Sequence, residues 1–203
     1  MPSADFFLRR VHSLTGIVPI GFFMLEHMFS ISQAIVGPAA FDRTVSFLQS
    51  LPFVVPLEIG FIAVPLAFHA FYGLYVAYLA KNNQLSYRYF RNWMFYLQRA
   101  TAVITLAFLV WHVWVLRIGK ALYGTEITFS HMAGLLGDPL VFALYAVGLA
   151  AGLLHFVNGL WTFLITWGIT IGPRSQTAAM YACSFVFVFL YAVGVRALFA
   201  FVS

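Results

Sequence analysis

Four histidines lie inside four long apolar stretches of this chain, one in each stretch: His27, His69, His112 and His155. An ionisable ring is costly in the interior of a membrane, and such residues there usually have a function. Imidazole is a common ligand for iron, and two imidazoles can hold one flat metal cofactor from its two faces. The four histidines therefore predict two pairs of axial ligands to two such cofactors.

The composition indicates that the apolar stretches cross a membrane. The chain has 203 residues, of which 63% are hydrophobic and 8% are charged, whereas a soluble domain carries about 25% charged residues. The apolar runs are continuous rather than alternating, which favours helices of about 20 residues over a β-barrel. We therefore predict an all-α integral membrane protein, a single domain over residues 1–203 with a cofactor-binding four-helix bundle at its core. The five predicted transmembrane helices cover residues 11–35, 57–80, 93–116, 139–167 and 178–202.

The basic residues predict how the chain is oriented. The formal charge of +5 comes largely from the connections between helices, so it indicates membrane topology rather than nucleic-acid binding. Cytoplasmic loops carry an excess of Lys and Arg. Because the excess lies on the side of the N-terminus, we predict that the N-terminus is cytoplasmic and the C-terminus is outside. The inner side carries Arg9, Arg10, Lys81, Arg88, Arg91 and Arg174, and the outer side carries Arg43, Arg117 and Lys120.

In this orientation the position of each histidine converts to a depth, since an α-helix rises about 1.5 Å per residue. His27 and His112 lie about 24 and 28 Å from the inner ends of their predicted helices. His69 and His155 lie about 17–18 Å from the inner ends of theirs, and the other pairings would differ in depth by roughly 6–11 Å. We therefore predict an outer pair, His27 with His112, and an inner pair, His69 with His155, stacked in the bundle as a path for electrons.

Two questions stay open from the residues alone. The histidines could form hydrogen bonds between helices instead of binding metal, although four at two matched depths make this the weaker interpretation. Gly73, Gly152 and Gly159 share helical faces with His69 and His155. These glycines leave space either for a flat macrocycle or for close packing between helices.

Five further polar residues in apolar surroundings are candidate contacts. His12 and Ser13 start the first helix and could bind a haem propionate or a quinone carbonyl, or lie in an ordinary interfacial position. Arg99 could pair with a propionate of the inner haem or extend to the inner surface. Glu26 and Glu58 could relay protons or hydrogen-bond a quinone ring, and Glu58 could instead be a solvated interfacial residue.

Several motifs of the chain resemble those of a known family. That family is the di-haem cytochrome b membrane subunit of succinate dehydrogenase or fumarate reductase, and the most similar type is its single-subunit, five-helix b-558 form. The resemblance extends over nearly the whole chain. The motifs are FLRRVHSLTG at 7–16, LPF at 51–53, LEI at 57–59, FHAFYG at 68–73, RNWMFYLQR at 91–99, VWHVW at 110–114 and LHFVNGLW at 154–161.

This resemblance implies that the two cofactors are b-type haems. Position by position, His69 and His155 match the iron ligands of the proximal haem, and His27 and His112 match those of the distal haem. The depths of the four histidines give the same two pairs independently. The chain alone would not oxidise succinate but would serve as the membrane anchor and electron-transfer subunit of the complex.

The resemblance also implies partners and a membrane. A flavoprotein subunit and an iron–sulfur subunit would dock on the basic inner face, in the cytoplasmic membrane of a prokaryote. The lipid-soluble substrate would be a quinone, in this subgroup usually menaquinone. Its site in the family lies near the distal haem, which makes Glu58 and Glu26 candidate contacts. Electrons would travel from succinate to quinone, or in reverse for fumarate reduction.

Two other functions fit the same helices. The cytochrome b subunit of a hydrogenase or a formate dehydrogenase is also a multi-helix bundle with two haems, and a nickel or molybdenum partner would identify it. A haem-free proton-linked transporter would also carry ionisable residues within its membrane helices. The absence of haem bands from a reduced-minus-oxidised spectrum would identify that case.

Overall fold

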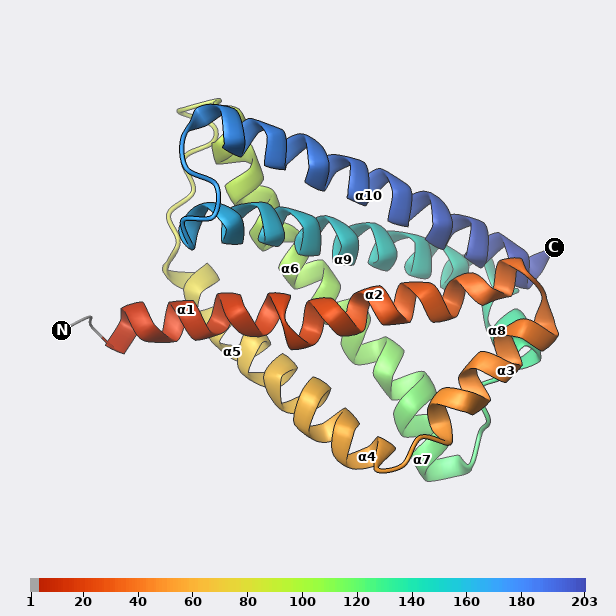
Figure 1. The fold of residues 1–203 in the computed structure, drawn as a ribbon. Coiled ribbons are helices and arrows are strands. Elements are labelled where there is room, and N and C mark those ends of the chain that lie inside the picture. The colour runs from red at the N-terminus through yellow and green to blue at the C-terminus, as the bar shows by residue number, and fades with distance from the viewer. Residues whose placement is uncertain (1–3) are drawn as a thin grey trace.

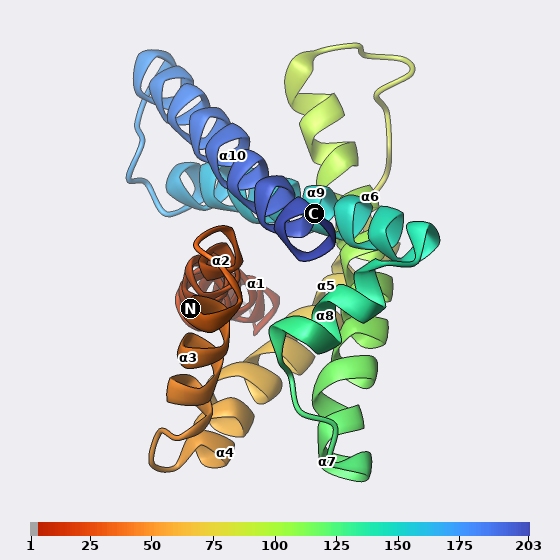
Figure 2. The ribbon, with the colours of Figure 1, turned by 90° about the vertical axis from the view of Figure 1, so that its right-hand side faces the viewer.

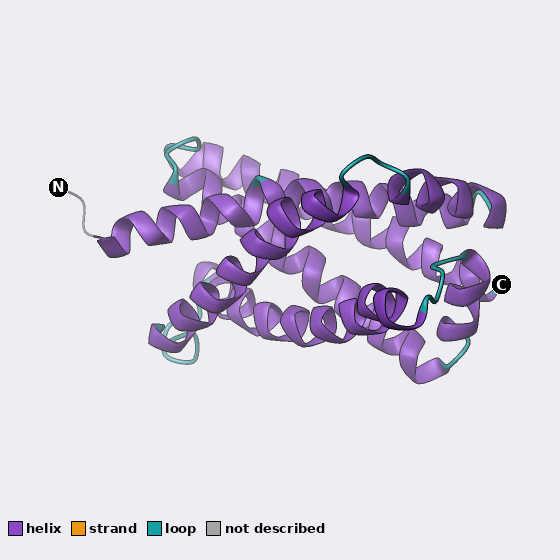
Figure 3. Ribbon diagram, turned by 90° about the horizontal axis from the view of Figure 1, so that it is seen from below, coloured by secondary structure: helices purple, strands orange, loops and turns teal. Residues whose placement is uncertain are grey.

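The computed structural model describes residues 4–203, and this part of the chain consists of helices and loops (Figure 3). Five helical stretches are long and apolar enough to cross a membrane, which confirms the predicted all-α fold with five spans. The described part of the chain begins and ends at opposite ends of the molecule (Figure 1), as an odd number of crossings requires. The stretches are Ala4–Ile35, Val54–Leu79, Phe90–Tyr123, Pro139–Thr166 and Pro173–Val202.

The first span consists of α1 (Ala4–Ile17) and α2 (Pro19–Ser32), which are separated at Pro19. Proline lacks a backbone N–H and crowds the preceding turn, so it interrupts the helical hydrogen bonds. The span begins seven residues before the predicted start at residue 11. The prediction followed the apolar run alone, whereas the polar first turns are stabilised by an Asp5–Arg9 ion pair of 2.8 Å.

The second and third spans each contain a wider, π-helical turn near the end remote from the N-terminus. Such turns are rare and occur frequently at functional sites. In the second span Pro65 follows the wide turn and cannot donate a hydrogen bond back to it. The second span comprises α4 (Val54–Leu57), η2 (Glu58–Ala63) and α5 (Val64–Leu79), and the third comprises α6 (Phe90–Val113), η3 (Trp114–Ile118) and α7 (Gly119–Tyr123).

Four of the spans form a closed ring of helices. α5 contacts α1, α2 and α6, while α9 (Pro139–Thr166) contacts both α6 and α1. The fifth span, α10 (Pro173–Val202), lies outside this ring and packs along α9 and against α2. Seen end-on, α9 lies between α10 and α6, which diverge from each other (Figure 2). The bundle that carries the four histidines is therefore made by the first four spans.

Short helices close the end of the bundle that holds the C-terminus. The connection after the first span contains the short turn η1 (Gln33–Ile35) and then α3 (Pro38–Gln49). The connection between the third and fourth spans contains α8 (Phe129–Leu136). The Asp42 carboxylate accepts a hydrogen bond from the backbone N–H of Phe129 at 2.7 Å, which satisfies a free donor at the start of α8. This contact joins the two connections.

Large apolar side chains point outward along every span. Water would make such a surface unfavourable, whereas lipid makes it favourable, because apolar area has no cost there. The outer surface is therefore that of a protein surrounded by hydrocarbon. One example from each span is Phe22 (68% exposed), Phe71 (75%), Val110 (64%), Val147 (55%) and Phe185 (72%).

Candidate functional site

The four membrane histidines meet in two pairs inside the bundle. His27 on α2 faces His112 on α6, with 6.0 Å between the ring centroids and ring planes at 80°. His69 on α5 faces His155 on α9, with 6.1 Å between the centroids and planes at 82°. These are the same two pairs that the depth argument predicts. Two imidazoles bound to opposite faces of one metal, each at about 2.0 Å, bring their ring centroids to roughly 6 Å from each other.

The inner pair is oriented by backbone carbonyls. His69 Nδ1 lies 3.0 Å from the carbonyl oxygen of His12, and His155 Nδ1 lies 3.0 Å from that of Gln98. A carbonyl oxygen can only accept, so each Nδ1 carries the proton and each Nε2 keeps its lone pair. Metal-binding histidines are held in this way, with the second nitrogen donating to a carbonyl.

Gly16 makes the position of His69 possible. A Cβ atom at residue 16 would lie 2.5 Å from Cε1 and 3.0 Å from Nδ1 of His69. Real Cβ contacts of that length do not occur, and the imidazole cannot swing aside without losing its bond to the His12 carbonyl. The crossing of α1 and α5 therefore requires glycine at this position.

His12 and Ser13, which the sequence marked as candidates, lie beside the inner pair. The His12 ring stacks on His69 with 4.2 Å between centroids and 8° between planes. Its Nε2 is buried and has no hydrogen-bond partner among residues 4–203. The Ser13 hydroxyl instead accepts a hydrogen bond from Trp167 Nε1 at 2.9 Å. His12 is therefore the one of the two whose polar atom faces the interior.

Sequence reasoning missed two residues that position His155. The Gln98 side-chain amide donates to the carbonyl of His155 at 3.1 Å, so the two residues bond each other in both directions. Asn158, which is 5% exposed, donates to Gln98 Oε1 at 2.7 Å and to the Met94 carbonyl at 2.9 Å. Two amides in apolar helices, one of them three residues after a candidate ligand, were the signal that could have identified them.

The outer pair lies among aromatic rings. Phe23 stacks on His27 at 5.6 Å, while Phe108 and Tyr145 contact His112 at 5.4 and 5.6 Å. His112 Nδ1 and the Tyr145 hydroxyl are buried and have no hydrogen-bond partner within the described residues. Buried polar atoms are nearly always paired, so such exceptions point to a missing ion or group. The outer site is therefore suited to a bound cofactor that brings polar atoms.

The donor sets fit haem better than a metal bound by protein alone. No group of three or more His, Cys, Asp or Glu residues converges anywhere in residues 4–203. A structural metal site made by protein needs about four ligands. Two facing imidazoles, in contrast, supply only the axial ligands of an iron whose other four are the nitrogens of a porphyrin. The residues present therefore fit one haem at each pair.

The glycines that could have made room for a macrocycle mostly face other side chains. A Cβ at Gly73 would lie 3.0 Å from Nε2 of His12, and one at Gly159 would lie 3.3 Å from Nε2 of Gln98. A Cβ at Gly152 would be 3.7 Å or more from its neighbours, which is an ordinary contact. Close packing thus accounts for the first two glycines.

Arg99 and Glu26 differ in their surroundings. Arg99 lies over the Phe95 ring at 3.6 Å and donates to the side chain of Asn82, in the connection between α5 and α6. It thus extends toward the N-terminal end of the bundle. Glu26 accepts a hydrogen bond of 2.5 Å from the buried hydroxyl of Ser30, one turn further along α2. A half-buried carboxylate next to His27 is therefore anchored within its own helix.

Glu58 forms an ion pair that joins the two π-helical turns. Its Oε2 accepts hydrogen bonds from Nε and Nη2 of Arg117 at 2.9 and 2.5 Å. Glu58 opens η2 and Arg117 lies in η3, so the pair connects the second and third spans near their outer ends. Both side chains keep more than a third of their surface exposed.

Comparison with known proteins gives two matches. Residues 78–194 match a family described as the succinate dehydrogenase/fumarate reductase transmembrane subunit. The succinate dehydrogenase cytochrome b558 subunit of Bacillus subtilis (strain 168) is 48% identical over 198 residues, which cover 98% of each chain. The family match contains the third and fourth spans, with His112 and His155. The match to the Bacillus subtilis subunit extends over nearly the whole chain and so contains all four membrane histidines.

Proposed function

Since the chain belongs to the succinate dehydrogenase/fumarate reductase transmembrane subunit family, we propose that each histidine pair binds one b-type haem. The chain is a membrane cytochrome b subunit of this enzyme class, which sets aside the hydrogenase, formate dehydrogenase and transporter alternatives. The two haems would carry electrons across the membrane between an iron–sulfur subunit and a quinone, for which we propose menaquinone.

The observation that carries this proposal is the geometry of the inner pair. His69 and His155 come from facing helices, with 6.1 Å between ring centroids. Both hold the Nδ1 proton on a backbone carbonyl and so present Nε2 as a neutral donor. Hydrogen bonds between helices would explain either imidazole alone. Such hydrogen bonds do not explain two facing imidazoles that both donate from Nδ1 to a backbone carbonyl.

The distribution of charge supports the proposed partners and orientation. Arg9 and Lys81 lie exposed at the end of the bundle where the first span begins. We propose that this end is cytoplasmic and receives an iron–sulfur subunit, which in turn carries a flavoprotein with the dicarboxylate site. The chain itself then supplies the membrane anchor.

Haem content tests this proposal directly. We expect the purified complex to contain two b-type haems for each copy of this chain, both low-spin because two histidines occupy both axial positions of each iron. A pyridine haemochrome assay with protein quantification measures the ratio, and a reduced-minus-oxidised spectrum identifies the haem type. One haem per chain, or none, contradicts the proposal.

We further propose that the quinone binds near the outer pair, where Glu58 and Arg117 bridge η2 and η3. Their ion pair supplies both a cation and a carboxylate beside two rare π-helical turns. Glu26, one residue from His27 and bonded to Ser30, is a second candidate for holding a proton in this region. In this proposal both carboxylates supply protons to a quinone that receives electrons.

Glu58→Gln tests the quinone proposal. We expect about a tenfold loss of succinate–quinone activity, because one charged hydrogen bond of about 1.4 kcal/mol is removed. Transfer to a water-soluble acceptor that takes electrons from the soluble subunits should stay unchanged. The matched control is Glu126→Gln, which removes an equivalent outer ion pair with Lys120. Equal losses in both variants, or in both assays, would contradict a specific role for Glu58.

A further inference from the structure

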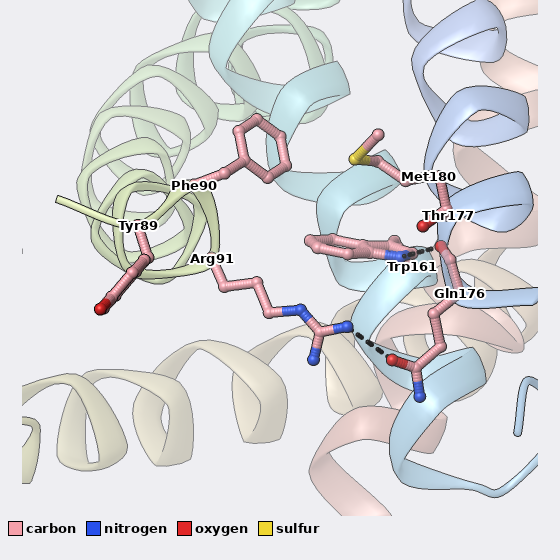
Figure 4. Close-up of a pocket in the computed structure, with 7 residues that line it drawn as sticks. All are labelled: Tyr89, Phe90, Arg91, Trp161, Gln176, Thr177 and Met180. Atoms are coloured by element: carbon pink, nitrogen blue, oxygen red, sulfur yellow. Dashed lines mark hydrogen bonds between the residues drawn. The ribbon is translucent and has the colours of Figure 1, made fainter. Parts of the chain in front are cut away.

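A groove opens above α9 between the starting ends of α6 and α10. A cavity of about 380 Å³ lies in it, and Figure 4 shows the side chains around it. A second cavity of about 390 Å³ adjoins the first at Thr177 and continues along α10 past Arg174 and Tyr181. Each cavity is of a size that holds a small organic ligand. The first is lined mainly by Phe90, Arg91, Trp161, Gln176, Thr177 and Met180.

The floor of the groove is a fixed polar arrangement. Trp161 Nε1 donates to the backbone carbonyl of Gln176 at 2.9 Å. Arg91 Nη2 donates to the side-chain oxygen of Gln176 at 2.5 Å, and its guanidinium carbon lies 5.9 Å from the centroid of the Trp161 ring (Figure 4). Arg91 is thereby turned toward the cavity instead of extending freely into solvent.

The electrostatic surroundings of the groove are strongly positive. Arg91 and Arg174 line its two parts, no Asp or Glu lines either cavity, and neither arginine forms an ion pair among residues 4–203. α6 and α10 both begin here, and helix N-termini carry partial positive charge. Of the six acidic residues in the chain, only Asp5 lies at this end, where it pairs with Arg9. No acidic side chain among the described residues therefore neutralises Arg91 or Arg174 in the groove.

The walls of the groove are apolar and exposed. Phe90 and Tyr181 are 53% and 67% exposed, and Met180 adds a third apolar surface. α10 and α6 diverge from each other above α9 (Figure 2), and both belong to membrane spans, so these exposed side chains face lipid. A ligand that satisfies both parts needs an anionic head and a hydrocarbon tail.

We propose that this groove binds one anionic phospholipid, with its phosphate at Arg91 and Arg174 and an acyl chain along the exposed apolar side chains of α6 and α10. Guanidinium groups bind phosphate by charge-assisted hydrogen bonds, and basic pockets between membrane helices are suited to anionic head groups. Trp161 and Gln176 hold Arg91 in place, so the site selects the head group rather than merely attracting it. The exposed apolar walls belong to two membrane spans, which favours a lipid over a soluble protein partner as the occupant.

Native mass spectrometry of the purified intact complex tests this proposal. The probes are phosphatidylglycerol and phosphatidylcholine with identical acyl chains. We expect one tightly held phosphatidylglycerol, with Arg91→Gln and Arg174→Gln each weakening its binding about fivefold, as expected for one basic residue near an anionic lipid. Phosphatidylcholine binding should not change. Arg88→Gln is the matched control, because it removes an exposed arginine from the same end without lining either cavity.

A second variant keeps both charges and blocks the tail. Thr177→Trp, at an exposed position shared by the two cavities, should abolish the tightly held lipid, and size-exclusion chromatography reports whether each variant still assembles. Retention of the lipid in this variant overturns the proposal, as does an equal loss in Arg88→Gln. Displacement by millimolar inorganic phosphate would reveal a site for the free ion. Loss of the soluble subunits with lipid binding intact would reveal a protein interface, and either result overturns the lipid assignment.

Discussion

We expect replacement of either histidine of one pair to remove the same haem. We expect His69→Ala and His155→Ala each to reduce the haem content from two per chain to one, with the same absorption band lost in both. His27→Ala and His112→Ala should each remove the other haem. The reason is geometric, because each pair has 6.0–6.1 Å between ring centroids and a single imidazole leaves one axial position of the iron unbound. Haem quantification together with low-temperature difference spectra measures both losses.

His131→Ala is the control for this series. His131 lies in α8, which the structure places in the outer connection and not in either pair, so its replacement should leave two haems. Where an alanine variant fails to assemble, the corresponding glycine variant with added imidazole restores a free ligand in the vacated space. Loss of different haems by the two members of one pair would overturn the pairing, and so would rescue of the wrong haem by imidazole.

The pairing could be predicted from sequence because it depends on one constant. Helical rise is nearly the same in every α-helix, so residue number converts to depth even where Pro19 divides the first span. The five apolar runs likewise mark the helices, since lipid enforces continuous helices. Residue spacing and apolar runs can both be read from the sequence without knowing which helices face each other.

Contacts across the bundle could not be predicted in the same way. The bond between Gln98 and His155 depends on how α6 and α9 are rotated toward each other, which hydropathy does not determine. The Glu58–Arg117 pair depends on two wide turns whose positions come from local packing. From the sequence, Glu58 could be either a functional contact or a solvated interfacial residue. Its partner Arg117 lies 59 residues away in the chain, so the ion pair could not be predicted.

A single methyl group at residue 16 should disable the inner site. Gly16→Ala places a Cβ 2.5 Å from Cε1 of His69, where no such atom fits. The imidazole must move, and its bond to the carbonyl of His12 is then lost. Weakening the groups that orient a metal ligand typically costs 10- to 100-fold in affinity. We therefore expect at least about a tenfold weaker hold on the inner haem, with the outer haem unchanged, measured by haem loss to an excess of apomyoglobin.

Two other glycines turn this prediction into a test of mechanism. A Cβ at Gly134 in α8 would meet no atom within 4 Å, and alanine favours a helix over glycine by about 1 kcal/mol, so Gly134→Ala should retain both haems. Gly152→Ala would place its Cβ 3.7 Å from Thr105 and 3.8 Å from Met24, which is ordinary contact. If Gly152→Ala releases a haem while Gly16→Ala does not, space for the macrocycle limits binding, and the argument from the position of His69 fails. The reverse result shows that the crossing of α1 over α5 determines where the ligand can lie.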